Sequence, residues 1–230
     1  MEKKKKITKK NYNKHKFPIY YGIHLEIEEE RKLLESVKNS IDKIYDNFKE
    51  DFSKTYEIIS ELIKRYDESK KGNEDNTKQN NIIEVNKMKY PKTFHITTAF
   101  GGKKGFNQNS SAVKEFNLGK KVEFKILGLV VIPEKMVITP IKAEFHTENI
   151  FAHFTTFIGD LKPVQSNDIL ENLFSDGQEM ENDYDDIIEG KSDECCKKVK
   201  VNIDGGEYDG YVYLNGKNSE LERRMKEYYF

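Results

Sequence analysis

Two short stretches of the sequence share the pattern histidine, apolar residue, threonine. They are His95–Thr97 and His153–Thr155, and they contain two of the five histidines of the chain. In a strand, side chains two residues apart point to the same face. Each stretch would therefore present one imidazole and one hydroxyl together, with Ile96 or Phe154 pointing into an apolar layer behind. Two such units could face one cleft from both sides.

The chemistry that such a cleft could perform is proton transfer at a phosphate. An imidazole has an unperturbed pKa of about 6.5, so it can act as an acid or as a base near neutrality. One imidazole would take a proton from water while the other gave a proton to a leaving oxygen. Thr97 and Thr155 would bind the non-bridging oxygens and stabilise the charge that develops on them. We therefore predict His95, His153, Thr97 and Thr155 as catalytic residues, with no metal and no cofactor.

A single histidine in a strand is usually a packing or surface residue. The prediction of a catalytic role therefore depends on finding the same pattern twice. The frames around the two stretches also agree, because residues 93–98 and 151–156 are similar and both precede an aromatic residue and a glycine. The other histidines lack this pattern. His24 is interpreted as a core or rim residue, His146 as a residue beside a turn, and His15 as part of an N-terminal arm.

Composition bounds the kind of protein. The 230 residues are 36% hydrophobic and 34% charged, which suits one globular domain with polar insertions. The net charge of −1 hides a basic N-terminus and an acidic stretch at 176–194. A globally basic nucleic-acid-binding protein is excluded. Residues 1–16 are predicted to be a flexible lysine-rich arm, either a solvated tail or an RNA-contacting segment.

Cysteine usage and hydropathy predict the compartment. Cys195 and Cys196 are adjacent and form no disulfide framework, which favours a reducing environment. No apolar run approaches the roughly 20 residues that span a bilayer. The N-terminus lacks a secretory signal, and the C-terminus lacks a prenylation cysteine. We expect a soluble monomer without a membrane anchor, cytoplasmic or nuclear.

The N-terminal half predicts a strand followed by a long helical region. Residues 17–27 are aromatic and β-branched, with a proline near the start. From 28 to 66, apolar residues recur at three- and four-residue steps. One helix of that length would measure about 58 Å, so we favour a break near Asp51–Ser53 that makes a helical hairpin over one projecting helix. Residues 67–81 are predicted to be a flexible linker.

The C-terminal half predicts strands with few helices. Strands are expected at 92–100, 121–132, 136–144 and 150–158, with a hairpin turn at 133–135. A helix follows at 161–174, with Ser166 or Asn167 as its N-cap. The acidic segment 175–194 is predicted to be a flexible loop, residues 197–214 alternating strands with a turn at 205–206, and the last dozen residues a short helix. The fold class is α+β with antiparallel sheets.

Beyond these patterns, the sequence resembles the 2H phosphoesterase superfamily, and within it the catalytic domains of 2′,3′-cyclic-nucleotide 3′-phosphodiesterases. The resemblance covers about residues 17–175. It rests on both histidine–threonine stretches and on four further pieces, which are Pro18–Gly22, Thr98–Phe100, Val130–Lys135 and Pro163–Leu170. The sequence departs from the family at Phe151, where the family has a basic residue. The family's preceding kinase-like domain and prenylated tail are not matched either.

The resemblance implies a two-lobed fold of antiparallel sheets flanked by helices, with the motifs on central strands and the active site in the cleft between the lobes. It implies metal-independent hydrolysis of 2′,3′-cyclic phosphates of nucleotides or RNA ends to 2′-phosphates, with His153 as base and His95 as acid. The residues that it implies for substrate binding are Phe100 and Tyr20 at the base, and Pro163, Val164, Gln165 and Ser166 beside the phosphate, near a helix N-terminus.

Two other functions stay open at this point. The same two-histidine chemistry could trim or repair RNA 3′ ends, and a non-catalytic domain could bind RNA through the cleft and the lysine-rich arm. Intact motifs argue against a pure binder, because binding alone has little need for paired proton-transfer groups. In domain terms, residues 17–230 are predicted to form a single domain.

Overall fold

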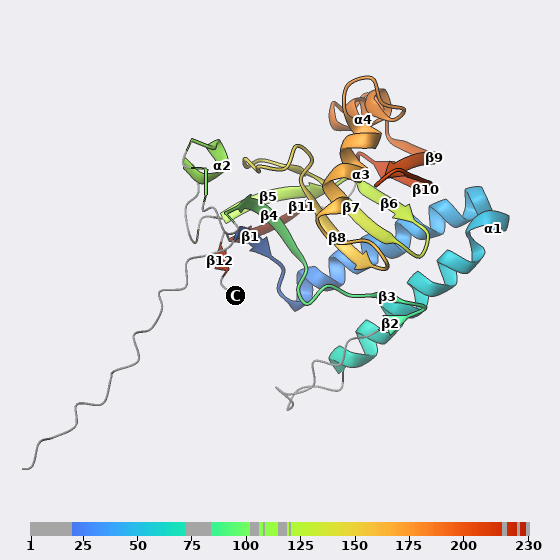
Figure 1. Ribbon diagram of the computed structural model, residues 1–230. Helices are drawn as coiled ribbons and strands as arrows, with labels where there is room; N and C mark the ends of the chain where they lie inside the picture. The colour runs from blue at the N-terminus through green and yellow to red at the C-terminus, as the bar shows by residue number, and fades with distance from the viewer. Residues whose placement is uncertain are drawn as a thin grey trace, which may run out of the picture.

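A computed structural model describes residues 20–71, 84–101, 106–107, 109–114, 119, 121–217, 220–224 and 226–228. The predicted arm at 1–16 and the larger part of the predicted linker, 72–81, lie outside these residues. The described chain is α+β, with antiparallel sheets flanked by helices (Figure 1), which confirms the predicted fold class. No described helix is both long and apolar enough to cross a membrane.

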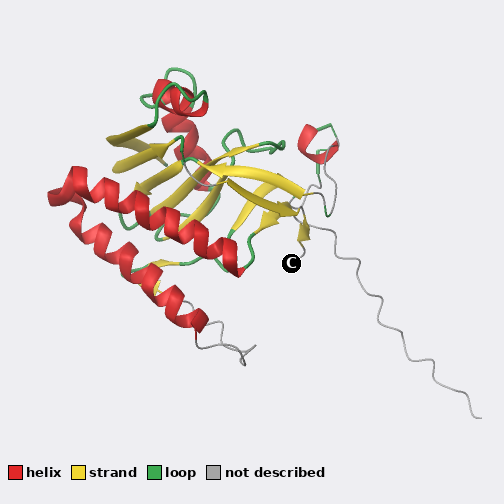
Figure 2. Ribbon diagram, turned by 180° about the vertical axis from the view of Figure 1, so that it is seen from behind, coloured by secondary structure: helices red, strands yellow, loops and turns green. Residues whose placement is uncertain are grey.

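Helix α1, Ile27–Lys71, folds back on itself as a hairpin with two arms (Figure 2). The chain leaves helical geometry at Phe48, where φ is −131° and ψ is 38°. The predicted hairpin is confirmed, but its break comes a few residues earlier than expected. The rings of Phe48 and Phe52 both pack on Tyr211, with centroid distances of 5.4 and 4.9 Å. This bend lets both arms lie against the same sheet.

The second arm of α1 also runs further than predicted. Residues 67–71 are helical, so the predicted linker begins later than expected. Two contacts bind this end of the helix to its start. The ammonium group of Lys70 lies 3.6 Å from Glu30, and the hydroxyl of Tyr66 also donates to Glu30. Packing between the two arms thus continues the helix into residues 67–71, whose composition alone predicts a loop.

The smaller sheet contains three described strands in the order β12-β1-β4, which are β12 (Lys226–Tyr228), β1 (Tyr20–His24) and β4 (His95–Phe100). In the β1–β4 register, His24 lies opposite His95. The predicted C-terminal helix is wrong, since β11 (Glu220–Arg224) pairs with β5 and β12 pairs with β1. The edges of β5 and β1 form backbone hydrogen bonds with this segment, and such pairing prevails over a local preference for helix.

The larger sheet contains nine described strands. Its main path is β2 (Glu84–Val85), β3 (Met88–Lys89), β8 (His153–Ile158), β7 (Met136–Ala143), β6 (Gly128–Ile132), β10 (Gly206–Asn215) and β9 (Glu194–Ile203). Strand β5 (Lys121–Ile126) joins β7 to β11. The strand predicted at 121–132 divides at Leu127. Gly128 follows with φ of 152°, and a Cβ there would lie 1.9 Å from the Tyr213 carbonyl oxygen.

Three short helices complete the described chain, and they are α2 (Ser111–Lys114), α3 (Gln165–Phe174) and α4 (Glu181–Ile188). Helix α4 contradicts the loop predicted for 175–194. One face of this acidic helix is apolar and packs inward. Its residues Tyr184 and Ile187 are buried, and the Tyr184 ring stacks on that of Phe174 with a centroid distance of 4.5 Å. The acidic composition of this segment predicts a loop, but the three-residue spacing of Tyr184 and Ile187 is typical of a helix with one buried face.

The large sheet has a buried cluster on each face, so it is the middle layer of the molecule. Leu129 and Val131 of β6 belong to the cluster under α1, whereas Val130 and Ile132 belong to the cluster under α3 and α4. The two ribbon views show α1 along one side of the sheet and α3 with α4 on the other (Figures 1 and 2). Strand β8, which carries the second motif, contributes Phe154 and Phe157 to the cluster under α1.

Candidate active site

Each predicted catalytic histidine is the first residue of a strand. His95 begins β4 and His153 begins β8, and these two strands approach each other although they belong to different sheets. Strand β8 is internal to the large sheet, whereas β4 lies at the edge of the three described strands of the small one. The resemblance implies a central strand for both motifs. Burial lowers the pKa of His153 most, and the positive charge of a protonated His95 lowers it by a smaller amount, so the charge of one imidazole affects the other.

The alternation predicted for the motifs is confirmed. Ile96 and Phe154 are 0% exposed and belong to the buried cluster. Thr97 and Thr155 are half-buried and share a strand face with their histidines. The apolar residue in the middle of each motif thus anchors the strand, and the residues on either side of it face away from the core.

The two imidazoles are oriented in the same way. The Nδ1–H of His153 donates to the carbonyl of Phe151 at 2.7 Å, and the Nδ1–H of His95 donates to the carbonyl of Thr93 at 3.2 Å. In both cases the acceptor lies two residues before the histidine. A carbonyl can only accept, so Nδ1 must carry the proton and Nε2 is left for chemistry.

The second motif contacts the start of α3 through one hydroxyl. The Ser166 Oγ lies 2.7 Å from His153 Nε2 and 2.6 Å from the Pro163 carbonyl oxygen, and the Thr155 hydroxyl donates to it at 3.2 Å. Ser166 is only 1% exposed. The predicted N-cap role of Ser166 or Asn167 is wrong. Val164 occupies that position, and the Ser166 hydroxyl turns back toward β8 instead of toward the helix amides.

The first motif lies in a stack of rings. The His95 ring centroid is 4.9 Å from that of His24 and 5.1 Å from that of Tyr20, and the Tyr20 hydroxyl is 3.2 Å from His24 Nε2. Sequence reasoning missed His24 as a neighbour of the site, since only the β1–β4 register brings it there. Tyr20 is 8% exposed, so most of its ring is covered. Its predicted contact with a nucleobase stays a prediction.

The remaining predicted substrate residues lie in two groups. Phe100 ends β4 with its ring 62% exposed, and its amide donates to the Glu148 carboxylate at 2.9 Å. The Glu148 amide donates in turn to the Thr98 carbonyl at 2.7 Å. The loop before β8 is therefore bound to the end of β4, a link between the motif strands that the sequence did not indicate.

The second group precedes and begins α3. Pro163 and Val164 are exposed, whereas Gln165 is 8% exposed with its side-chain amide engaged at both ends. Its oxygen accepts from the Lys162 amide and its nitrogen donates to Asp204, each at 2.7 Å. Gln165 thus ties the start of α3 to the turn between β9 and β10. Contacts of these three residues with a substrate stay predictions.

Burial controls the protonation of both histidines. The pKa of His153 is lowered to about 4, mainly by burial. The Phe151 carbonyl opposes this shift, and the neighbouring His95 adds a little to it. Burial also lowers the pKa of His95, against the Thr93 carbonyl. At neutral pH the free protein therefore holds both imidazoles uncharged, which is the form that a base must have.

This shift predicts a dependence of stability on pH. His153 has a lower pKa folded than unfolded, so the unfolded chain binds the proton first as pH falls from 6.5 toward 4. Over that window the free energy of unfolding should decrease by about 3 kcal/mol relative to pH 7 on account of His153. Urea unfolding at pH 7, 5.5 and 4.5 measures it.

The matched controls are two glutamine variants. His153→Gln should lose most of this pH dependence, whereas His146→Gln, at an exposed position, should keep it. Equal pH dependence in the wild type and in His153→Gln would contradict the shift.

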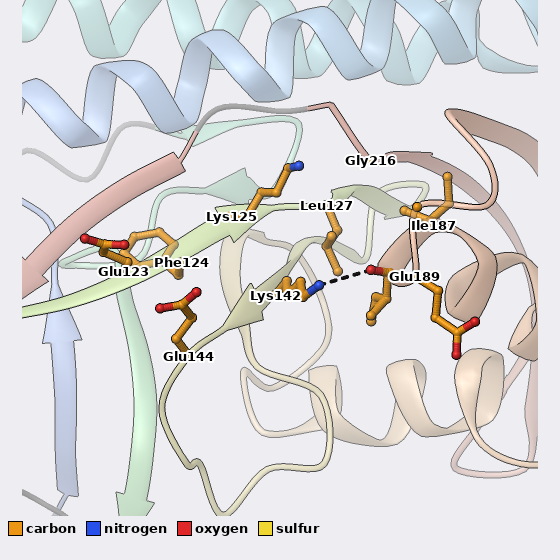
Figure 3. A pocket seen from close by; sticks show the side chains of 11 residues that line it. Glu123, Phe124, Lys125, Leu127, Lys142, Glu144, Ile187, Glu189 and Gly216 are labelled. Atoms are coloured by element: carbon orange, nitrogen blue, oxygen red, sulfur yellow. Dashed lines mark hydrogen bonds between the residues drawn. The ribbon is translucent and has the colours of Figure 1, made fainter.

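A separate hollow of about 260 Å³ lies between β5, β7 and the end of α4 (Figure 3). Charged side chains surround it, and the Lys142 ammonium group donates to the Ile188 carbonyl at 3.0 Å. The residues that line it include neither motif. Among all the described residues, no group of three or more His, Cys, Asp or Glu side chains is arranged to hold a metal ion.

Comparisons with known proteins find a distant structural likeness. No protein-family model matches the chain, and no curated protein matches it in sequence. The crystal structure of a fungal RNA kinase is similar with a TM-score of 0.49 and 16% sequence identity, over 96% of this chain and 47% of that one. The chain thus spans about half the length of that structure. A likeness of this size assigns no activity.

Proposed function

We propose that the protein is a phosphodiesterase of the 2H type, which hydrolyses 2′,3′-cyclic phosphates of nucleotides or RNA ends to 2′-phosphates. One observation carries the proposal, and it is the matched anchoring of two imidazoles. His95 and His153 each begin a strand and each fix Nδ1 on the carbonyl two residues back. In both rings Nε2 is thereby the nitrogen that can gain or lose a proton, which suits one reaction that needs both an acid and a base.

The proposed reaction moves one proton at each histidine. Neutral His153 takes a proton from water at Nε2, and the water oxygen attacks phosphorus. The bond from phosphorus to the ribose O3′ breaks, and protonated His95 gives its proton to O3′. The product is a 2′-phosphate. The hydroxyls of Thr97 and Thr155 bind the non-bridging oxygens, where negative charge builds up in the transition state.

The unequal burial of the histidines supports their unequal roles. His153 is 7% exposed and its pKa is lowered to about 4, so it meets the substrate as a neutral base. His95 is less buried, and an acid must be protonated when it acts. The negative charge of a bound cyclic phosphate raises the pKa of a nearby imidazole. Substrate binding thereby promotes protonation of His95 at the time when it is needed.

The exposed ring of Phe100 supports the substrate class. It lies at the end of β4, five residues after His95, and is 62% exposed. An exposed aromatic ring beside a phosphate site can stack on a nucleobase, and such stacking contributes about 1–3 kcal/mol per base. The Tyr20 ring stacks on that of His95 at 5.1 Å, and its contact with the base stays a prediction.

The test is hydrolysis by the purified protein in EDTA. Substrates are 2′,3′-cyclic AMP, 3′,5′-cyclic AMP and an RNA that ends in a 2′,3′-cyclic phosphate, and ³¹P NMR distinguishes 2′- from 3′-phosphate products. We expect 2′-phosphate from the first and third substrates only, at the same rate with and without EDTA.

Four results would overturn the proposal or parts of it. A 3′-phosphate product would reverse the assigned leaving oxygen, and loss of turnover in EDTA would contradict a metal-independent mechanism. Cleavage only of internal RNA linkages would indicate 3′-end trimming instead. RNA binding without turnover of any substrate would indicate a binding domain and reject the enzyme.

A further inference from the structure

The hydroxyl of Ser166 is in contact with more groups than one hydrogen can satisfy. It lies 2.7 Å from His153 Nε2 and 2.6 Å from the Pro163 carbonyl oxygen, and it accepts from Thr155. The Pro163 carbonyl also accepts the Ser166 amide at 3.1 Å, which fixes its position. All of this occurs where Ser166 is 1% exposed, so solvent has little access to supply a missing partner.

The number of hydrogens in this cluster depends on the charge of His153. Its Nδ1–H is donated to Phe151, so in the neutral ring Nε2 can only accept. Ser166 must then donate either to Nε2 or to Pro163, and one of the two short contacts lacks a hydrogen. In the protonated ring, Nε2–H donates to Ser166, and Ser166 donates to Pro163. Every contact is then made.

We propose that Ser166 is a positioning residue that makes His153 a stronger base, by turning its hydroxyl from Nε2 to the Pro163 carbonyl when His153 takes up a proton. This proposal rests on the proposed function for its catalytic meaning, but the contact between Ser166 and His153 does not. No covalent bond of Ser166 breaks. The Ser166 hydrogen first rotates to the Pro163 carbonyl, which frees the Nε2 lone pair. An O–H bond of the attacking water then breaks, its proton forms the new Nε2–H bond, and the Ser166 oxygen accepts from that bond.

The need for such a partner follows from burial. Burial disfavours the imidazolium and so makes His153 a weak proton acceptor. A hydrogen bond from a charged donor is stronger than one between neutral groups, so the Ser166–Pro163 pair stabilises the imidazolium more than the neutral ring. Ser166 thereby offsets part of the effect of burial while keeping His153 away from bulk water.

The groups around His153 show why Ser166 is the residue that stabilises its protonated form. Within the described chain, His95 on β4 is the titratable group that bears on the charge of His153, and it opposes protonation. Ser166 from α3 is the neutral partner of His153 Nε2, and Thr155 on β8 contacts Ser166. Thr155 donates to Ser166, so it orients the Ser166 oxygen lone pairs. Carbonyl and hydroxyl dipoles are therefore what can stabilise a proton on His153.

The first part of the experiment needs no turnover. Nitrogen-15 NMR of the histidine rings, from pH 8 to pH 4, follows the tautomer and protonation of His153 in wild type, Ser166→Ala and Ser166→Thr. We expect a wild-type ring with the proton on Nδ1 that begins to protonate toward pH 4. In Ser166→Ala the pKa should fall by about one to two units, so the ring stays neutral. Ser166→Thr keeps the hydroxyl and should restore wild-type titration.

The second part measures catalysis with 2′,3′-cyclic AMP. Ser166→Ala should lower kcat about tenfold, as expected for a weaker base, with KM changed less than twofold, and it should shift the acid limb of the pH profile to lower pH. Ser40→Ala is the matched control. It removes another buried serine hydroxyl that donates to a backbone carbonyl, that of Ser36 at 2.8 Å, and should leave kcat and the pH profile unchanged.

The outcomes separate this inference from the proposed function. An unchanged His153 pKa in Ser166→Ala, in a protein with wild-type thermal stability, would overturn the role of Ser166 even if the enzyme is active. A lowered pKa in a protein that hydrolyses no cyclic phosphate would support the coupling and reject the proposed reaction. A fall in kcat without a shift in the pH profile would indicate a structural role and reject the positioning role.

Discussion

Replacing His153 with glutamine should lower kcat/KM for 2′,3′-cyclic AMP by about 10³-fold, within the range of roughly 10²–10⁴ that general acid–base groups contribute. Glutamine can still accept from Ser166 and occupies similar space, but it cannot take up a proton. His95→Gln should cause a loss of the same order, because the leaving O3′ would then depart without a proton. Initial rates at substrate concentrations well below KM give kcat/KM directly.

The pH profiles distinguish the two roles. Burial lowers the pKa of both histidines, so the wild-type kcat/KM should be highest below pH 6.5. Its acid limb should follow His153, which must be neutral, and its alkaline limb His95, which must be protonated. His153→Gln should flatten the acid limb, and His95→Gln the alkaline limb. The exposed His146→Gln control should keep the wild-type profile.

Two results would contradict this assignment. If the double variant retained wild-type activity, the paired motif would not be the site of chemistry. If each single variant flattened the opposite limb from the one expected, the proton-transfer roles would be reversed. Since the two histidines act in one reaction, the double variant should lose little more than either single variant.

The motif geometry was predictable from sequence because it depends on a local rule. Side chains alternate along a strand, so His95 and Thr97 had to share a face once β4 formed, and the fully buried Ile96 follows from the same rule. The helical hairpin was predictable from its apolar period and length. The position of its bend was not, since Phe48 leaves helical geometry where its ring meets Tyr211 on a distant strand.

What the sequence could not reveal depends on contacts between distant segments. Strand β12 pairs with β1 across almost the whole chain, and no local preference of Lys226–Tyr228 encodes that partner. His24 joins the site because the β1–β4 register places it opposite His95. The residue type of Ser166 predicts an N-cap role, yet its hydroxyl turns toward His153, which lies 13 residues earlier. Each of these errors arises where tertiary contacts prevail over a local signal.

The residue between His153 and Thr155 joins the site to the core, so its loss should have the largest effect on stability. Phe154 is 0% exposed in the cluster under α1, with its ring centroid 5.7 Å from that of Phe124. Phe154→Ala should lower the free energy of unfolding by about 3–5 kcal/mol, because it removes the buried ring and leaves a cavity that the sheet cannot close. Urea denaturation at pH 7, followed by circular dichroism, measures this change.

Phe100→Ala is the matched control on the other motif strand. Its ring is 62% exposed, so its removal should change stability by less than about 0.5 kcal/mol while raising KM if the ring stacks on the base. Phe154→Leu, which fills most of the space, should cost less than alanine and keep kcat in the folded protein. Equal destabilisation by Phe100→Ala and Phe154→Ala would contradict the burial assigned to the two rings. A Phe154→Leu variant that is stable but inactive would show that the core sets the positions of His153 and Thr155 more tightly than strand alternation alone requires.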